Sequence, residues 1–137
     1  MTEQELLNLI ARARDEEWEE LDLAGLDLEV LPPEIGSLVK LKRLILGRFD
    51  RELCNLGNKL TDLPAELELL ENLEVLSAHD NQFTTIPKSI EKLTSLRELD
   101  LSNNKIAVIP EFIRQFTNLQ YLDLGCNSIG FIPEFIE

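Results

Sequence analysis

Leucines and other apolar residues recur in one spaced pattern along most of the chain. The pattern is LxxLxL, and its five copies begin at residues 18, 41, 73, 96 and 119. Trp18 takes the first position of the first copy, and Ala78 takes the last position of the third. The intervals between starts are 23, 32, 23 and 23 residues. A fixed period in the twenties predicts a solenoid, in which each repeat buries its apolar face against its neighbours.

Each position of the repeat has an expected structural role. The alternating LxL residues predict a short strand with leucines facing inward, and successive strands should stack in parallel. Asparagine at the ninth position can hydrogen-bond backbone groups in the following turn, so we expect an asparagine ladder in which Leu26 of the first unit is the exception. An apolar residue followed by proline then predicts a short helical or 3₁₀ segment on the outer side. These pairs are Leu31-Pro32, Leu63-Pro64, Ile86-Pro87, Ile109-Pro110 and Ile132-Pro133.

The two ends of the repeat array look different. Residues 1–17 predict a helix that covers the first unit, because Thr2 and Glu5 form a capping-box pattern and apolar residues follow at helical spacing. Residues 18–137 are expected to form the repeat domain. The fifth unit stops within its outer segment without a polar cap, so we expect either a fragment of a longer chain or an end that contacts something. The predicted fold class is therefore α/β: a right-handed solenoid of five repeats with a capping helix and a parallel concave sheet.

The second interval is nine residues longer than the others, 32 against 23. The extra residues, about 47–57, begin where the strand should end and close at Gly57-Asn58. We expect a loop that leaves the stack undisturbed, since loop-closure entropy grows slowly with length. Mere tolerance of the insertion is one interpretation. The other is a binding finger at the rim of the concave face, with Arg48, Phe49 and Arg51 as a basic and aromatic tip.

Two family resemblances rest on these repeats. The stretch LRELDLSNNKI at residues 96–106, followed by Ile109-Pro110, resembles leucine-rich repeat proteins of the 23-residue intracellular type over roughly residues 18–137. The stretch EELDLAGLDLEVLPPEIGSLVKLKRLILG, with an insertion that ends in GNKLTDLP, resembles the N-terminal repeat region of bacterial, particularly cyanobacterial, Roco-type proteins. That second resemblance implies a recognition arm of a signalling protein with a Ras-like GTPase. The chain itself contains no GxxxxGK[ST] motif.

Charge and composition narrow the range of partners. The formal net charge is −13, which should repel nucleic acid phosphates and anionic lipid headgroups. No apolar stretch approaches the roughly 20 residues that cross a bilayer. The two cysteines give no disulfide framework, so we expect a cytoplasmic protein. From the charge and the short apolar stretches we expect protein partners and neither nucleic acid nor membrane contact.

Catalytic and metal-binding residues are sparse. His79 lies close in sequence to Ser77 and Asp80, and Asp100 and Asp123 should be neighbours on adjacent strands, which together raise a hydrolase hypothesis. No nucleophile motif or oxyanion loop accompanies them, and the surface should be open to water. One histidine and two distant cysteines lack zinc-site spacing. We therefore expect no enzyme, no catalytic residues, no metal and no cofactor.

The concave sheet face is the predicted protein-binding surface. Ile45, Val75 and Tyr121 should project from it into water, inside a charged border typical of interfaces, although ordinary β-propensity would also explain these three residues. The sequence favours a non-catalytic protein–protein interaction module that uses this face and the 47–57 insertion. The predicted concave-face residues are Arg43, Ile45, Val75, Ser77, His79, Glu98, Asp100, Tyr121 and Asp123.

A second surface is predicted on the outer C-terminal side. Equivalent outward positions change from polar in early units to apolar in the last two, at Val108, Phe112, Phe131 and Phe135. A hydrophobic strip there would contact a fused downstream domain or another copy of the chain. The alternative function is therefore a structural or regulatory arm of a larger GTPase signalling protein, which docks or forms a homo-oligomer through its C-terminal end.

Overall fold

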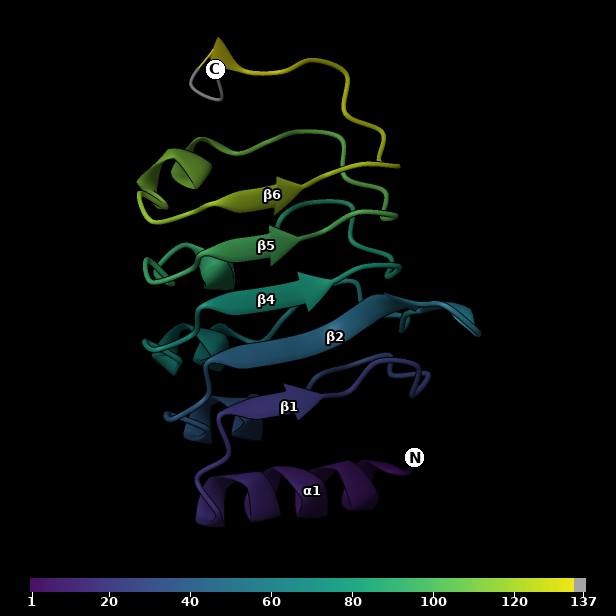
Figure 1. The fold of residues 1–137 in the computed structure, drawn as a ribbon, viewed down its shortest axis with the longest axis vertical. Helices are drawn as coiled ribbons and strands as arrows, with labels where there is room; N and C mark the ends of the chain where they lie inside the picture. The colour runs from purple at the N-terminus through teal and green to yellow at the C-terminus, as the bar shows by residue number, and fades with distance from the viewer. Residues whose placement is uncertain (135–137) are drawn as a thin grey trace.

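Five parallel strands stack into one sheet that runs the length of the molecule (Figure 1). The computed structural model describes residues 1–134. The strands pair in the order β1-β2-β4-β5-β6, one strand from each repeat. Their bounds are Glu20–Asp22 for β1, Arg43–Asp50 for β2, Val75–Ala78 for β4, Glu98–Asp100 for β5 and Tyr121–Asp123 for β6. The predicted solenoid with a parallel sheet is confirmed.

The leucine pattern sets the register of this sheet. Leu44 pairs with Leu21 on one side and Leu76 on the other, and Leu99 pairs with Leu122. Residues at the same repeat position are therefore neighbours on adjacent strands. The side chains of Leu44, Leu76 and Leu99 are almost completely buried in a single apolar core. A one-residue slip would turn each strand's leucines toward water, which explains why the register is so regular.

The outer side of each coil is a short 3₁₀ helix that follows a proline. Within residues 1–134, four of these helices are complete: η1 (Pro33–Ser37), η2 (Ala65–Leu69), η3 (Lys88–Ile90) and η4 (Glu111–Gln115). The repeat proline precedes each helix in an extended conformation and fixes the direction in which the chain turns. Each helix then buries one β-branched or leucine side chain in the core: Ile35, Leu67, Ile90 and Ile113.

The ninth-position asparagines form the predicted ladder. The buried Asn104 accepts a hydrogen bond from the backbone N–H of Phe83 at 3.0 Å, and its Nδ2 donates to the carbonyls of Ala78, Leu101 and Ser102. Every asparagine thus serves its own turn and the preceding coil. The first unit can therefore have Leu26 in place of asparagine. Asn58 of the second unit accepts from the backbone N–H groups of Leu26 and Leu28 in the first coil.

Helix α1 (Glu3–Asp15) covers the first coil. Its capping box is complete, since the Thr2 hydroxyl accepts from the Glu5 amide and the Glu5 carboxylate accepts from the Thr2 amide. Leu6 and Ile10 are buried against the first repeat. At the opposite end, the leucines of the last coil are only half-buried. Within residues 1–134, no helix has the length and apolar character needed to cross a membrane.

The insertion expected as a loop at about residues 47–57 forms a β-hairpin. Strand β2 continues through Asp50 and pairs antiparallel with β3 (Cys54–Leu56). The pairing with β4 is irregular between Ile45 and Gly47, after which β2 extends beyond the ends of the other strands (Figure 1). Gly47 and Gly57 make this departure possible, because a Cβ at either position would overlap the carbonyl oxygen of a neighbouring turn residue, His79 or Asp80.

Candidate protein-binding surface

The outward-facing residues of the sheet form two rows that cross all five strands. One row contains Glu20, Arg43, Val75, Glu98 and Tyr121, and the second contains Asp22, Ile45, Ser77, Asp100 and Asp123. Both rows follow directly from the leucine register. Residues of the first row come just before the first inward residue of each strand, and residues of the second row lie between the two inward residues. They line a shallow groove of about 260 Å³.

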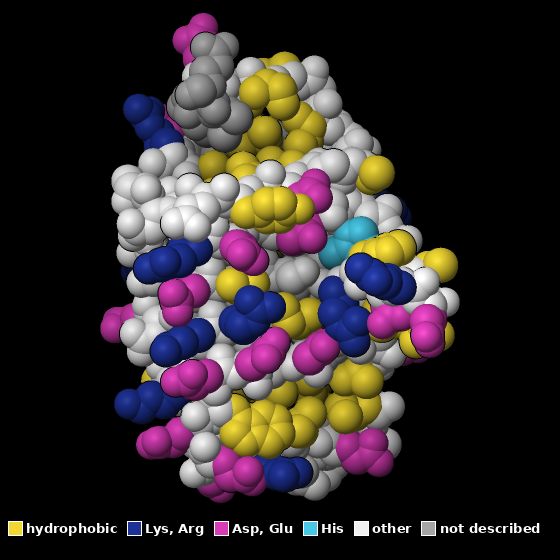
Figure 2. Space-filling view, viewed as in Figure 1, with side chains coloured by type: hydrophobic (Ala, Val, Ile, Leu, Met, Phe, Trp, Pro, Cys, Tyr) yellow, Lys and Arg dark blue, Asp and Glu magenta, His cyan; other side chains and the backbone are white. Residues whose placement is uncertain are grey.

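Ion pairs neutralise the part of the groove nearest the N-terminus. Arg43 Nε lies 3.2 Å from Glu20 Oε1, and Arg48 Nε lies 2.9 Å from Asp22 Oδ2. Arg48 also contacts Asp50 at 3.3 Å. The hydrogen bond to Asp22, followed by its negative charge, raises the pKa of Arg48 above its ordinary value. Basic and acidic side chains accordingly alternate over β1 and β2 (Figure 2).

Ile45 is not the exposed contact residue that the sequence predicts. Its side chain is only 6% exposed. The cause is the hairpin: Arg48 reaches back from β2 to Asp22, the residue that pairs with Ile45 on β1, and this ion pair spans the space beside the isoleucine. Val75 and Ser77 are half-buried on the next strand. The apolar centre of the concave face is therefore smaller than expected.

The part of the groove formed by β5 and β6 is acidic and has no counter-charge. Within residues 1–134, no Lys, Arg or His nitrogen lies within 4.0 Å of the carboxylates of Glu98, Asp100 or Asp123. Figure 2 shows acidic and hydrophobic side chains close together on this face of the molecule. Tyr121 is 51% exposed there. We call the residues Glu98, Asp100, Tyr121 and Asp123 the acidic half of the concave face.

The Tyr121 hydroxyl responds to this negative field. It donates to Asp123 Oδ2 at 3.2 Å. That hydrogen bond raises the pKa of Tyr121 above its ordinary value, and the negative charges of Asp123, Asp100 and Glu98 act in the same direction. The hydrogen bond thus fixes the position of the hydroxyl group, while about half of the Tyr121 surface remains exposed to solvent.

His79 connects the hairpin to the sheet. Its Nδ1 lies 2.8 Å from Ser102 Oγ, and its Nε2 lies 2.7 Å from Asn55 Oδ1 on β3. Ser102 Oγ also lies 2.6 Å from Asp100 Oδ1. A carboxylate can only accept, so Ser102 donates its hydroxyl proton to Asp100. Sequence reasoning identified His79 and Asp100 but not their partners Asn55 and Ser102, which come from separate coils.

These contacts do not build the hydrolase site considered from the sequence. Ser77 donates its hydroxyl to the Gly47 carbonyl at 2.6 Å, and the side-chain hydrogen bonds of His79 within residues 1–134 are to Ser102 and Asn55 instead. Ser102 does touch His79, but its proton is directed to Asp100 and its side chain is buried. A histidine base cannot activate a hydroxyl whose proton is already given to a carboxylate. In the described part of the chain, no three His, Cys, Asp or Glu residues are arranged to hold a metal ion.

The hairpin tip presents apolar side chains at the rim of the groove. Phe49 is 65% exposed and Leu53 is 67% exposed. Arg51 is also exposed, whereas Arg48 is engaged in the ion pairs at the hairpin base. The predicted basic and aromatic tip therefore keeps Phe49 and Arg51, loses Arg48 and gains Leu53.

The hairpin turn is fixed by Asp50. Its Oδ1 accepts from the backbone N–H groups of Glu52 and Leu53, both at 2.9 Å. These two bonds, that to Leu53 first, hold the pKa of the Asp50 carboxyl below its usual value. The exposed tip residues are consequently carried on an ordered turn.

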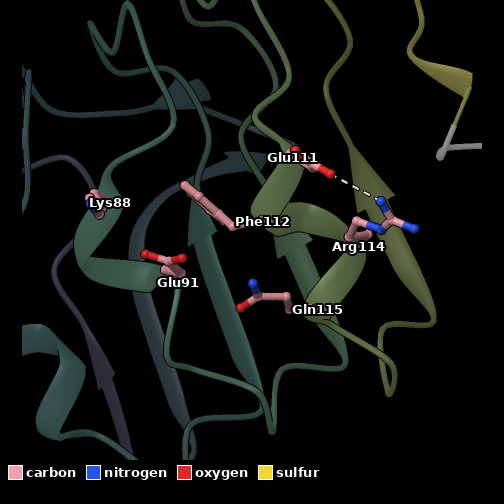
Figure 3. Close-up of a pocket in the computed structure, with 6 residues that line it drawn as sticks. All are labelled: Lys88, Glu91, Glu111, Phe112, Arg114 and Gln115. Carbon is pink, nitrogen blue, oxygen red and sulfur yellow. Dashed lines mark hydrogen bonds and ion pairs between the residues drawn. The ribbon is translucent and has the colours of Figure 1, made fainter.

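The predicted outer C-terminal strip is only partly present. Val108 and Phe131 are exposed, and Phe135 lies outside the described residues. Phe112 is half-buried and packs edge-to-face on Phe116, with ring centroids 6.3 Å apart. A cleft of about 770 Å³ lies between η3 and η4, and Phe112 is one of the residues that line it (Figure 3).

Comparisons with known proteins agree with this architecture. Residues 71–108 and 94–137 match the family model for leucine-rich repeats (2 copies). A leucine-rich repeat protein of Leptospira interrogans is 37% identical with a TM-score of 0.77, over 86% of this chain and 28% of that one. Internalin C2 of Listeria monocytogenes is 25% identical with a TM-score of 0.69, over 88% of this chain and 48% of that one. No curated protein matches the sequence.

A plant protein extends the same likeness. The peptide hormone receptor RGFR1, solved in complex with RGF2, is 36% identical with a TM-score of 0.62, over 79% of this chain and 16% of that one. The chain thus spans less than half the length of each of these structures. The repeat model, the register of the sheet and the shared fold identify the chain as a leucine-rich repeat protein.

Proposed function

We propose that the chain is a non-catalytic protein–protein interaction module that binds a partner through its concave face and hairpin. The observation that carries the proposal is the half-exposed Tyr121 on β6, beside carboxylates of β5 and β6 that form no ion pair within residues 1–134. Tyrosine is enriched among interface residues that contribute most binding energy. Leucine-rich repeat domains generally mediate protein–protein interaction, and the plant receptor of the same fold was solved in complex with RGF2.

The hairpin would serve as a second contact. It projects beyond the strand ends, and its tip carries Phe49 and Leu53 in exposed positions. Asp50 orders the turn, and the base is held by Arg48 on one strand and Asn55 on the other. An ordered tip loses little conformational entropy on binding, which favours affinity.

Capture of a native partner tests this function. We expect Tyr121→Ala and Arg43→Glu to weaken capture from a lysate of the source organism, since both side chains lie in the groove. Gln115→Ala on the outer side serves as control and should capture normally. Thermal denaturation should show nearly unchanged stability for all three variants. Retention of every partner by both groove variants would overturn the assignment to the concave face.

A second candidate function rests on the last coil. The amide N–H of Leu101 donates to Asp123 O at 2.9 Å, that of Asn103 to Gly125 O at 2.8 Å and that of Ile106 to Asn127 Oδ1 at 2.9 Å. The equivalent groups of the last coil are the amides of Leu124, Cys126 and Ile129, and none of these donates to an acceptor within residues 1–134. Hydrophobic side chains also gather there (Figure 2).

We propose, as this second function, an arm of a larger signalling protein, such as a Roco-type GTPase, which docks or self-associates through the last coil. Sedimentation at several concentrations tests self-association. A weight that rises with concentration, and falls to that of a monomer in Phe131→Glu, would support it. A strictly monomeric chain would overturn self-association, while binding to a separately expressed GTPase domain would report docking.

The proposed setting is the cytoplasm of a bacterium. Cys54 and Cys126 are both free and exposed. Exposed thiols of this kind suit a reducing compartment. Two of the similar structures come from Leptospira and Listeria, which supports a bacterial origin. Localisation of a tagged chain in the source organism would check both points.

A further inference from the structure

The acidic residues of the concave face lie in two different environments. On β1, Glu20 and Asp22 each have an arginine within 3.2 Å, contributed by β2 and the hairpin. On β5 and β6, the chain contributes no cation to Glu98, Asp100 or Asp123. Arg97, the base nearest in sequence, instead contacts Glu74 at 3.3 Å. The acidic half of the face is thus an unpartnered sheet surface that the described chain leaves charged.

The geometry keeps these carboxylates close together. Asp100 pairs with Asp123 across β5 and β6, and Glu98 pairs with Tyr121. Adjacent strands lie about 4.8 Å apart, so two negative charges face each other directly. Like charges in that position destabilise a sheet. A cation placed between them would remove the repulsion.

Free acceptor positions remain in this cluster. Asp100 uses Oδ1 for both hydrogen bonds from Ser102, so its Oδ2 has no hydrogen bond within residues 1–134. The side chain of Glu98 is exposed and makes no hydrogen bond to a described group. Asp123 uses one oxygen for Gly125 and the other for the Tyr121 hydroxyl, and each oxygen has further lone pairs. Tyr121 adds a half-exposed aromatic side chain, and aromatic rings attract cations.

We propose that the partner presents an extended segment with arginine side chains to the acidic half, with one guanidinium group between Asp100 and Asp123 and stacked on Tyr121. This inference rests on the proposed function and adds the chemistry of the partner. Arginine fits better than lysine, because its planar fork donates to two carboxylates while its face contacts an aromatic ring. Charge complementarity excludes an acidic peptide, a nucleic acid and an anionic membrane as occupants of this half.

A defined peptide tests the inference without the native partner. The probe is a blocked nine-residue peptide in which arginine alternates with threonine, and its counterpart has glutamine in place of arginine. Both are titrated against the ¹⁵N-labelled full chain by NMR. We expect the arginine peptide to bind at least about tenfold more tightly, the difference of one charge-assisted hydrogen-bond pair. Its shifts should concentrate on β5 and β6.

Isosteric variants identify the carboxylates. The double variant Asp100→Asn/Asp123→Asn should lose about tenfold in affinity for the arginine peptide. An asparagine Oδ1 can still accept from Ser102 and Gly125, so the fold is retained and the native spectrum confirms it. The matched control is Glu66→Gln/Glu71→Gln, which removes the same charge from exposed positions outside the concave face. It should change affinity by less than about twofold.

Several outcomes would overturn the inference. Equal binding of the two peptides, or no shifts with either, would show that the acidic half does not select arginine. An equal loss in the control variant would mean that only overall charge acts. Partner capture separates this failure from failure of the proposed function. If capture depends on Tyr121 but not on Asp100 and Asp123, the binding surface stands and only the chemistry of the partner is wrong.

Discussion

The first two coils and the last two coils are built from the same repeat but differ in what surrounds it. Helix α1 seals the first coil, and the arginines of β2 and the hairpin neutralise its acidic residues. The last coil has no such cover within residues 1–134, and the carboxylates of β5 and β6 have no counter-charge in the same range. In a repeat architecture each coil contacts only its neighbours, so these differences stay local.

The contrast separates residues that maintain the stack from residues that are available to partners. Leucine and asparagine positions recur from coil to coil, with Trp18, Leu26 and Ala78 as exceptions, because stacking requires them. Outward positions are free to vary. The carboxylates on β1 form ion pairs with arginines of the same chain, whereas the Asp123 carboxylate on β6 forms none within residues 1–134. Within residues 1–134, unpaired carboxylates and half-buried leucines therefore distinguish the C-terminal half from the N-terminal half.

The largest expected effect compares the apolar contacts of the two ends. Ile10→Ala removes a fully buried side chain between α1 and the first coil and should cost about 3 kcal/mol. Leu124→Ala acts on a half-buried side chain in the last coil and should cost about 1 kcal/mol. Urea denaturation measures both values. Equal losses would mean that the last coil is covered in solution, which would contradict the open end.

The asparagine ladder gives the next largest effect. Asn104→Ala leaves the buried Phe83 amide without its acceptor and removes one donor from each of three carbonyls, and should cost about 2 kcal/mol. Asn127→Ala should cost about 1 kcal/mol, because water reaches the half-buried groups of the last coil. The same denaturation experiment checks the pair. A larger loss for Asn127 would reverse the predicted gradient.

Charge removal should have opposite signs in the two regions. Asp123→Asn relieves repulsion with Asp100 and should raise the free energy of unfolding by about 0.5 kcal/mol. Asp22→Asn breaks the partly exposed ion pair with Arg48 and should lower it by about 0.5 kcal/mol. Precise denaturation midpoints at low salt would resolve these differences. A change in the free energy of unfolding of the same sign for both variants would contradict the difference between paired carboxylates on β1 and unpaired carboxylates on β5 and β6.

The smallest effect concerns the hairpin turn and pH. The Leu53 and Glu52 amides lower the pKa of Asp50, so their contribution is fully present above the ordinary carboxyl pKa of about 3.9. It is lost as the pH falls through the lowered value in the folded state. NMR signals of the two amides should therefore shift on acidification. In Asp50→Asn the amide oxygen still accepts, and this response should disappear, whereas an unchanged response would point to another carboxyl group.

The sequence predicts the stack well because its signal is repeated. Five leucine registers agree, and the asparagine and proline positions have one structural explanation each. The exposed Tyr121 and the adjacency of Asp100 and Asp123 follow from the same register. Position within the repeat was therefore sufficient to predict where these residues lie on the sheet.

Features that depend on the insertion could not be predicted. The hairpin turn places Cys54 at a positive φ of 65°, where glycine or asparagine is the usual residue, so the ordinary turn signal is absent. Burial of Ile45 depends on an arginine that reaches across to Asp22. The contact of His79 with Asn55 joins residues from the hairpin and the following coil. Neither the contact of Arg48 with Asp22 nor that of His79 with Asn55 joins residues at the same repeat position.

Photo-crosslinking tests the central claim, that a partner protein binds the acidic half of the concave face, most directly. A photoreactive amino acid would replace Tyr121 in one protein and Val39, an exposed residue of the outer loop after η1, in another. After irradiation in a lysate of the source organism, we expect a discrete crosslinked protein from position 121 and none from position 39. Crosslinks from position 39 alone, or the same products from both positions, would contradict the account.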